Sequence, residues 1–157
     1  MKIDMDTASL LKRTVMQRNQ FDNFLLQLSL FYPQLGTIDD VEPIVRGYED
    51  ANFTLVTSNG KFVLKIFAED MSITNALAHA DILYKAKDIG FPAAPIIINK
   101  DGAALSSILE NFCFITEYID GVTFENTKPN LAEIINITQA LAKLNQLKDD
   151  LTVSYDS

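Results

Sequence analysis

The chain has 157 residues, of which 48% are hydrophobic and 22% are charged, and its formal net charge is -8. This length suits one domain, or one lobe with an appendage, and the composition is that of a globular rather than a disordered protein. An acidic surface repels phosphate backbones, so we expect no nucleic acid partner. No apolar run approaches the roughly 18 residues that span a bilayer, so we expect no membrane partner either.

Cysteine and histidine each occur once, as Cys113 and His79. One cysteine excludes an intrachain disulfide, and one histidine argues against a His/Cys metal site, so no metal ligands are assigned. The N-terminus lacks the positive segment and apolar core of a signal peptide. Together these features predict a protein of the reducing cytoplasm.

Residues 1–35 predict an N-terminal helical extension. Apolar residues over 7–31 recur mostly at three- and four-residue steps, as in an amphipathic helix. Thr7 or Ser9 is a suitable N-cap, and Pro33 ends the pattern. The apolar face of this helix either packs on the next unit or forms a dimer or partner interface.

Residues 36–119 predict an α+β unit, an antiparallel five-stranded sheet with one inserted helix. Asn59-Gly60 predicts a type I′ hairpin turn, because both central residues of that turn need positive φ. The inserted helix is expected over 72–88, with Ser72 or Thr74 as its cap. Strand patterns, two or three on each side of this helix, cover 41–45, 52–57, 61–67, 95–98, 104–109 and 112–119.

Residues 120–157 predict a linker followed by one more helix. Segment 123–129 is polar and irregular, and Asn130 and Glu133 then form a capping box at the start of a helix over 130–147. The apolar face of that helix has little left in this chain to pack against.

Four motifs in order carry a resemblance to a known family. They are Gly47-Tyr48-Glu49-Asp50-Ala51-Asn52-Phe53, then Val63-Leu64-Lys65 after the hairpin, then Gly90-Phe91-Pro92-Ala93-Ala94-Pro95, and then the segment from Phe114 to Gly121. In this order, residues 36–147 resemble the N-terminal lobe of the aminoglycoside phosphotransferase and choline kinase superfamily, in particular its hydroxylysine kinase and type II homoserine kinase branches. The resemblance implies a protein-kinase-like small lobe that binds ATP with Mg²⁺.

Lys65 is the principal candidate for contacting the nucleotide. Strand side chains alternate, so Val63 and Lys65 share one face, which offers an apolar contact for adenine and a cation for the phosphates. The alternative is an exposed lysine on a half-buried strand.

The resemblance places the loop that begins at Gly47 over the triphosphate, with Asn52 capping this loop or touching the ligand. Glu49 and Asp50 fit direct phosphate binding poorly, because carboxylates repel phosphate. The alternative is a solvated turn.

The resemblance also places His79 where kinases hold the nucleotide lysine with a helix carboxylate. Asp81 is the other candidate, and the two side chains point about 200° apart on a helix, so only one faces the cleft. A neutral histidine accepts a hydrogen bond from Lys65 but supplies no full negative charge.

For the hinge, the resemblance assigns Ile115 as the gatekeeper beside the adenine. The resemblance also implies that the Thr116 carbonyl accepts a hydrogen bond from the adenine amino group. It further implies that the Tyr118 N–H donates to the adenine ring. The alternative is a plain buried strand, and Cys113 is expected in the core.

No catalytic residue is expected in this chain. The family carries its catalytic aspartate beyond the hinge in a His-x-Asp motif, and no histidine follows Tyr118. His79-Ala80-Asp81 matches the letters but precedes the hinge. One interpretation is the ATP-binding lobe of a kinase for a hydroxyl of an amino acid, amino alcohol or aminoglycoside-like acceptor, inactive without its missing C-terminal lobe. The others are a stand-alone nucleotide-binding module and a homodimer formed through helices 7–31 and 130–147.

Overall fold

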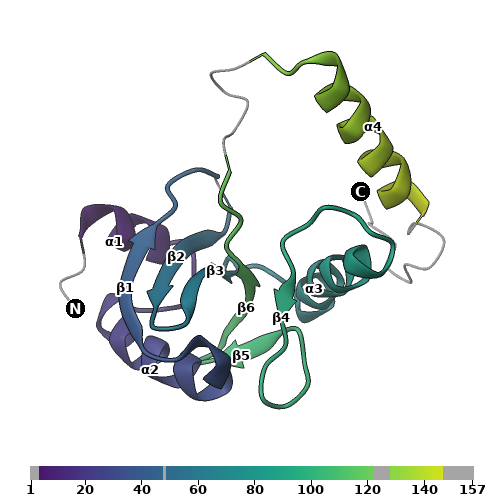
Figure 1. The fold of residues 1–157 in the computed structure, drawn as a ribbon. Helices are drawn as coiled ribbons and strands as arrows, with labels where there is room; N and C mark the ends of the chain where they lie inside the picture. Colours follow the sequence, from purple (N-terminus) through teal and green to yellow (C-terminus); the bar gives the residue numbers. More distant parts are fainter. Residues whose placement is uncertain (1–3, 48, 122–127, 147–157) are drawn as a thin grey trace.

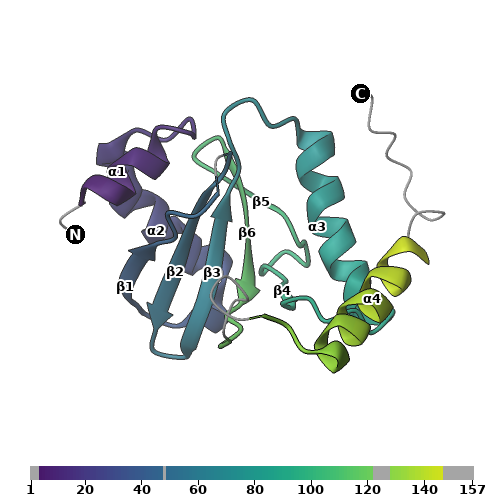
Figure 2. The ribbon, with the colours of Figure 1, turned by 90° about the horizontal axis from the view of Figure 1, so that it is seen from above.

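An antiparallel sheet with helices on both faces forms the body of the protein (Figures 1 and 2). This computed structural model describes residues 4–47, 49–121 and 128–146. The predicted α+β class is confirmed. The elements in chain order are α1 (Met5–Leu11), the 3₁₀ turn η1 (Arg18–Gln20), α2 (Phe21–Phe31), η2 (Pro33–Leu35), β1 (Ile38–Pro43), β2 (Ala51–Thr57), β3 (Gly60–Ile66), α3 (Ile73–Asp88), β4 (Ile96–Ile97), β5 (Ser106–Ile108), β6 (Asn111–Glu117) and α4 (Leu131–Gln146).

The sheet order is β1-β2-β3-β6-β4, and β5 also pairs with β6. Cys113 pairs with β3 and with β5, so β5 must lie on the edge of β6 that β4 also occupies. The sheet therefore has six strands in five positions. The predicted antiparallel sheet with an inserted helix is confirmed, and the sixth strand arises because β4 and β5 share one edge.

The N-terminal extension contains two α-helices where the sequence pattern predicted one helix over 7–31. The break follows Leu11, whose carbonyl accepts the Thr14 hydroxyl at 2.9 Å. The same hydroxyl accepts the Met16 N–H at 3.2 Å. A side-chain hydroxyl that bonds the backbone in this way competes with helix continuation.

Helix caps are partly as predicted. Asp4, rather than Thr7 or Ser9, caps α1, because its Oδ1 accepts the Thr7 N–H at 2.7 Å. That bond lowers the pKa of the Asp4 carboxyl. Ser72 caps α3 as predicted, accepting the Asn75 N–H at 3.2 Å.

The hairpin between β2 and β3 turns one residue earlier than predicted. Thr57 pairs with Gly60, so the loop is Ser58-Asn59. Neither loop residue has positive φ, whereas Gly60 has φ of 128°. The type I′ prediction is wrong, because the Thr57 hydroxyl organises the turn by donating to the Gly60 carbonyl at 2.9 Å and accepting the Asn59 N–H at 3.2 Å.

The two faces of the sheet are covered by different helices, as Figure 2 shows. On one face, α1 and α2 pack in the main core, and burying each large apolar side chain there stabilises the fold by about 1.5–3 kcal/mol. On the other face, α3 packs through a smaller cluster centred on Phe67, Ala76, Ala80 and Phe114. Cys113 is fully buried in the main core, as predicted, and burial raises the pKa of its thiol to about 12.

Helix α4 lies beside the C-terminal end of α3 rather than on the sheet (Figure 2). The Lys143 ammonium donates to the Gly90 carbonyl at 3.4 Å. The predicted capping box is present, since Asn130 and Glu133 each accept the other's backbone N–H. Five large apolar side chains of α4 are at least 43% exposed: Leu131, Ile134, Ile135, Ile137 and Leu141.

The predicted linker over 123–129 lies mostly outside the described residues. Within the described part of the chain, no helix is long and apolar enough to cross a membrane.

Candidate functional site

Strand pairing places Lys65 on the face of the sheet that carries α3. In the register, Lys65 lies opposite Asn52 of β2 and Phe114 of β6, and Val63 lies opposite Thr116. Side chains of directly opposed residues share a face and lie within contact reach. Four predicted site residues, Asn52, Val63, Lys65 and Thr116, are therefore brought together on what we call the cleft face.

A hollow of about 270 Å³ opens at one end of this face, lined by Gly47, Glu49, Asp50, Asn52 and Lys65. Gly47 has φ of 98°, which favours glycine, and the space beside its Cα is open. The Lys65 side chain is only 25% exposed. The Lys65 side chain therefore lines this hollow together with Gly47 and Asp50, in contrast to the alternative of a solvent-exposed lysine.

The partner of Lys65 is Asp50, a residue of the loop. Their Nζ and Oδ2 atoms are 2.7 Å apart, and the Asp50 side chain is only 8% exposed. The other carboxylate oxygen of Asp50 accepts the Ala68 N–H at 3.0 Å. A buried carboxylate needs such partners, because an unpaired buried charge is strongly unfavourable. The sequence predicted only that Asp50 repels phosphate, because no local pattern indicates that this side chain is buried.

His79 does not take the predicted place beside Lys65. Its ring stands nearly perpendicular to the Phe67 ring, with centroids 5.6 Å apart. The Lys65 ammonium lies 5.5 Å from the centroid of the same Phe67 ring. His79 and Lys65 thus both neighbour an aromatic ring, while the negative charge that holds Lys65 comes from Asp50.

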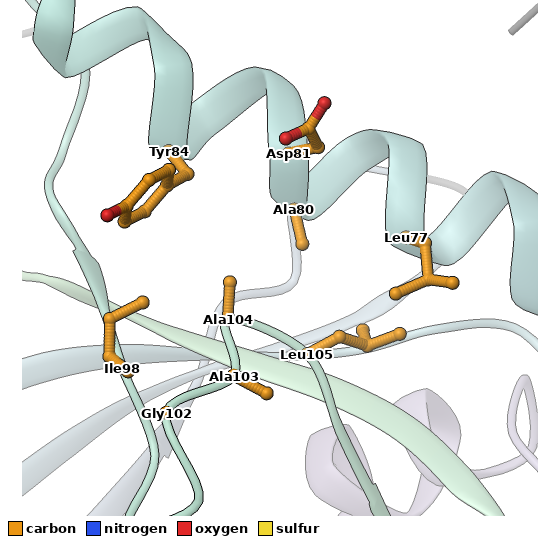
Figure 3. A pocket seen from close by; sticks show the side chains of 9 residues that line it. All are labelled: Leu77, Ala80, Asp81, Tyr84, Ile98, Gly102, Ala103, Ala104 and Leu105. Atoms are coloured by element: carbon orange, nitrogen blue, oxygen red, sulfur yellow. The ribbon is translucent and has the colours of Figure 1, made fainter. Parts of the chain in front are cut away.

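Asp81, the other candidate on α3, lines a different hollow. This hollow of about 430 Å³ lies between α3 and the segment that joins β4 to β5 (Figure 3). Its walls are mainly apolar, with Leu77 and Leu105 among them, and no basic residue lines it. Asp81 pairs with Lys85 at 2.8 Å. This hollow therefore has no lining cation that could pair with a phosphate group.

Ile115 lies on the opposite face from Lys65. It pairs with Leu64, and both side chains are buried in the main core with α1 and α2, each with 0% solvent exposure. Its predicted position beside adenine does not fit this geometry, because successive strand side chains point to opposite faces. Thr116, one residue later, faces the cleft and is 7% exposed.

The main chain of the hinge follows the same alternation. The Tyr118 N–H donates to the Lys61 carbonyl at 3.3 Å, so it is engaged inside the sheet. Residues two apart in a strand direct their N–H and C=O groups to the same edge, so Thr116 also bonds toward β3. Glu117 bonds toward the other edge, where its N–H donates to the Pro95 carbonyl at 2.9 Å. Proline has no N–H, so Pro95 cannot donate to the Glu117 carbonyl in return.

Comparison with known proteins identifies the relationship. Residues 40–157 match the family model described as the phosphotransferase enzyme family. The chain belongs to this family. The resemblance to the aminoglycoside phosphotransferase and choline kinase superfamily, for its N-terminal part, is thereby confirmed, and the protein is a kinase-like member of a phosphotransferase family.

Curated relatives of this phosphotransferase-family chain are similar over a limited part of their length. The homoserine kinase of Caulobacter sp. strain K31 is 27% identical over 111 residues, which are 71% of this chain and 34% of that protein. The homoserine kinase of Rhodopseudomonas palustris strain TIE-1 is 24% identical over 111 residues, 71% of this chain and 33% of that protein. The homoserine kinase of Bartonella henselae is 22% identical over 136 residues, 87% of this chain and 40% of that protein. The chain thus spans about a third of the length of these relatives.

The residues of the site suit the family's nucleotide better than a metal ion alone. The cleft face offers the Lys65 ammonium, the neighbouring Asn52 amide and apolar surface, which are the groups that phosphates and a purine ring contact. In the described part of the chain, no three side chains of His, Cys, Asp or Glu cluster so as to hold a metal ion.

Proposed function

We propose that this chain binds the nucleotide of an ATP-dependent small-molecule kinase. The observation that carries the proposal is the hollow that Lys65 lines together with Gly47 and Asp50, where its ammonium pairs with the Asp50 carboxylate. Lys65 contacts the α- and β-phosphates, and Asn52, opposite it in the register, borders the same space. Val63 provides apolar surface for the adenine ring. The bound ATP supplies the phosphoryl group, and its Mg²⁺ offsets the phosphate charge.

The hinge contacts shift by one residue from those expected from the sequence. We assign the gatekeeper position to Thr116, because its side chain faces the cleft opposite Val63. The Glu117 carbonyl accepts the adenine amino proton, since Pro95 leaves it without a donor. The N–H of Ile119, two residues on, then points to the same edge and donates to the ring.

Asp50 holds Lys65 in this proposal, in the role for which other kinases use a carboxylate of the inserted helix. Its charge is balanced by the Lys65 ammonium and the Ala68 N–H before the nucleotide arrives. The carboxylate therefore positions the ammonium and repels phosphate less than an isolated aspartate does.

The phosphate acceptor is proposed to be a hydroxyl of an amino acid, an amino alcohol or an aminoglycoside-like compound. The names of the relatives, which are homoserine kinases, support the amino acid class. No histidine follows Tyr118, so the family's His-x-Asp motif does not occur beyond the hinge. We therefore expect no phosphate transfer by this chain alone, and we propose that the exposed face of α4 packs against the lobe that carries the catalytic groups.

Titration with mant-ATP and Mg²⁺ tests the nucleotide site. We expect Lys65→Ala to weaken binding about tenfold, because a charge-assisted contact to phosphate is lost. Lys100→Ala is the matched control, since Lys100 lies over the Phe31 ring, away from the cleft face. Equal affinities for wild type and Lys65→Ala would contradict the proposal. A coupled ADP assay checks the absence of turnover, and measurable turnover would contradict that part alone.

A second candidate is an interaction protein that pairs through its helices. The supporting observation is that Leu26 and Leu30 of α2 are 64% and 63% exposed, in addition to the apolar face of α4. Sedimentation at several concentrations separates the candidates. A dimer that forms without any effect of nucleotide, in a protein that does not bind mant-ATP, would favour the interaction protein.

A further inference from the structure

Arg13, a residue of the N-terminal extension, contacts the loop that roofs the hollow. Its Nη1 atom donates to the Gly47 carbonyl at 2.9 Å and to the Asp50 carbonyl at 3.2 Å. These residues are 34 and 37 positions away in the sequence. Charged donors make stronger hydrogen bonds than neutral ones, so one guanidinium ties down both ends of the loop's backbone.

The position of Arg13 is itself fixed by the turn that follows α1. Its N–H donates to the Leu10 carbonyl at 3.0 Å, and its own carbonyl accepts the Glu69 N–H at 2.9 Å. The neighbours Leu11 and Thr14 are buried at 2% and 6% exposure. The side chain therefore leaves a rigid backbone, which limits the entropy lost in holding the loop.

The contacts form a closed circuit that includes Asp50, the ion-pair partner of Lys65. Arg13 binds the backbone of the loop, and the Asp50 carboxylate of that loop binds Lys65 and the Ala68 N–H. The backbone N–H of the next residue, Glu69, donates to the Arg13 carbonyl. Three segments distant in sequence are thus joined within hydrogen-bond distance, and the Lys65 ammonium is attached to them through Asp50.

We infer that Arg13 is a positioning residue of the nucleotide site, through which the N-terminal extension holds the loop over the phosphates. Two carbonyl oxygens that would repel phosphate are bonded to a guanidinium that does not line the hollow. The same contacts fix Asp50 and, through it, Lys65. This inference rests on the proposed function, since it concerns the loop and the lysine of that same site.

A purely structural role of Arg13 would have different consequences for stability and for nucleotide affinity. If it only fastens the extension to the sheet, its removal lowers the melting temperature and leaves nucleotide affinity unchanged. If it positions the loop, its removal weakens the binding of phosphates in particular. Adenosine, which has the base but no phosphate, separates these cases because it does not depend on the loop.

The experiment compares Arg13→Ala, Arg13→Lys and Lys12→Ala in the 157-residue chain. Lys12→Ala is the matched control, because it removes the same unit of charge from the adjacent, exposed position. Mant-ATP affinity is measured by fluorescence with Mg²⁺, adenosine by competition, and hydrogen exchange is followed for the amides of residues 49–53. We expect Arg13→Ala to weaken mant-ATP about fivefold and to speed loop exchange, with Arg13→Lys intermediate and Lys12→Ala within about twofold of wild type.

Unchanged mant-ATP affinity in Arg13→Ala would overturn the inference, as would unchanged loop exchange or equal weakening of mant-ATP and adenosine. If Lys65→Ala weakens mant-ATP and Arg13→Ala does not, the inference fails and the proposed function stands. If neither variant weakens it, both fail together. Should Arg13→Ala not fold, Arg13→Lys provides the same comparison, because lysine retains the charge and loses the reach and the fork of the guanidinium.

Discussion

The pair formed by Asp50 and Lys65 predicts an energetic coupling that a double-mutant cycle can measure. The cycle uses Asp50→Asn, Lys65→Met and the double variant. Asparagine keeps an oxygen for the Ala68 N–H and removes the charge, and methionine keeps the apolar stem of lysine without its ammonium. Each single change thus removes the ion pair with little loss of packing.

The magnitude follows from the distance and the burial of the pair. At 2.7 Å between Nζ and Oδ2, Coulomb attraction is about 1.5 kcal/mol in a water-like dielectric and about 6 kcal/mol at an effective dielectric of 20. Desolvation of both groups offsets much of this, so we expect a coupling of about 1–3 kcal/mol. Lys65→Met should cost more than Asp50→Asn, because it strands the carboxylate, which is 8% exposed, whereas the ammonium is 25% exposed.

Urea denaturation of the four proteins, followed by circular dichroism, gives the free energies of unfolding. The double variant should be more stable than the sum of the single losses predicts. Additive losses, within about 0.3–0.5 kcal/mol, would refute the coupling. A larger cost for Asp50→Asn than for Lys65→Met would refute the assignment of Asp50 as the more deeply buried partner.

Three further predictions concern single positions. Gly36→Ala should destabilise the fold by at least about 1 kcal/mol more than Gly102→Ala in the same denaturation assay, because both positions have positive φ but only at Gly36 would a Cβ collide with the Ser58 hydroxyl. Equal losses would show that the clash is relieved. His79→Gln should leave mant-ATP affinity within about twofold of the wild-type value, since Asp50 holds Lys65. A larger loss of affinity would show that His79 contributes to the nucleotide site. The Cys113 thiol should resist Ellman's reagent until denaturant is added. Its pKa is raised from 9.0 to about 12, so the unfolded chain releases its proton first and stability should fall as pH rises above 9. A stability profile that is flat or rising there would contradict the burial of the thiol.

Local patterns predicted much of the fold because they depend on neighbours in sequence. The Ser72 cap and the Asn130 capping box formed as expected, since each involves a backbone N–H only three residues away. Strand alternation correctly placed Val63 with Lys65 on one face. The errors at the hairpin and in the N-terminal helix arose where Thr57 and Thr14 bond the backbone, and composition does not reveal which bond a hydroxyl chooses.

The hinge shows why the site was only partly predictable. A period of two tells which side chains share a face, but both faces of β6 are apolar, with Phe112 and Phe114 on one and Cys113 and Ile115 on the other. Which face meets α1 and α2 depends on how the chain packs, so the sequence does not show that the Ile115 side chain faces the core and not the cleft. Packing of the extension against the side that carries Ile115 left Thr116 in the cleft.

The sequence by itself determined the order of the strands and of the inserted helix, the caps of α3 and α4, and the presence of a lysine on a strand after a glycine-containing loop. Those features follow from dihedral preferences and from side-chain periodicity within one segment. Tertiary structure alone decided that Asp50 pairs with Lys65 and that Arg13 reaches a loop 34 residues away. Such contacts form only after packing of the core has brought the two distant segments together. The entropy lost in closing the intervening loop is offset by burial of apolar side chains elsewhere, and no local sequence pattern encodes that balance.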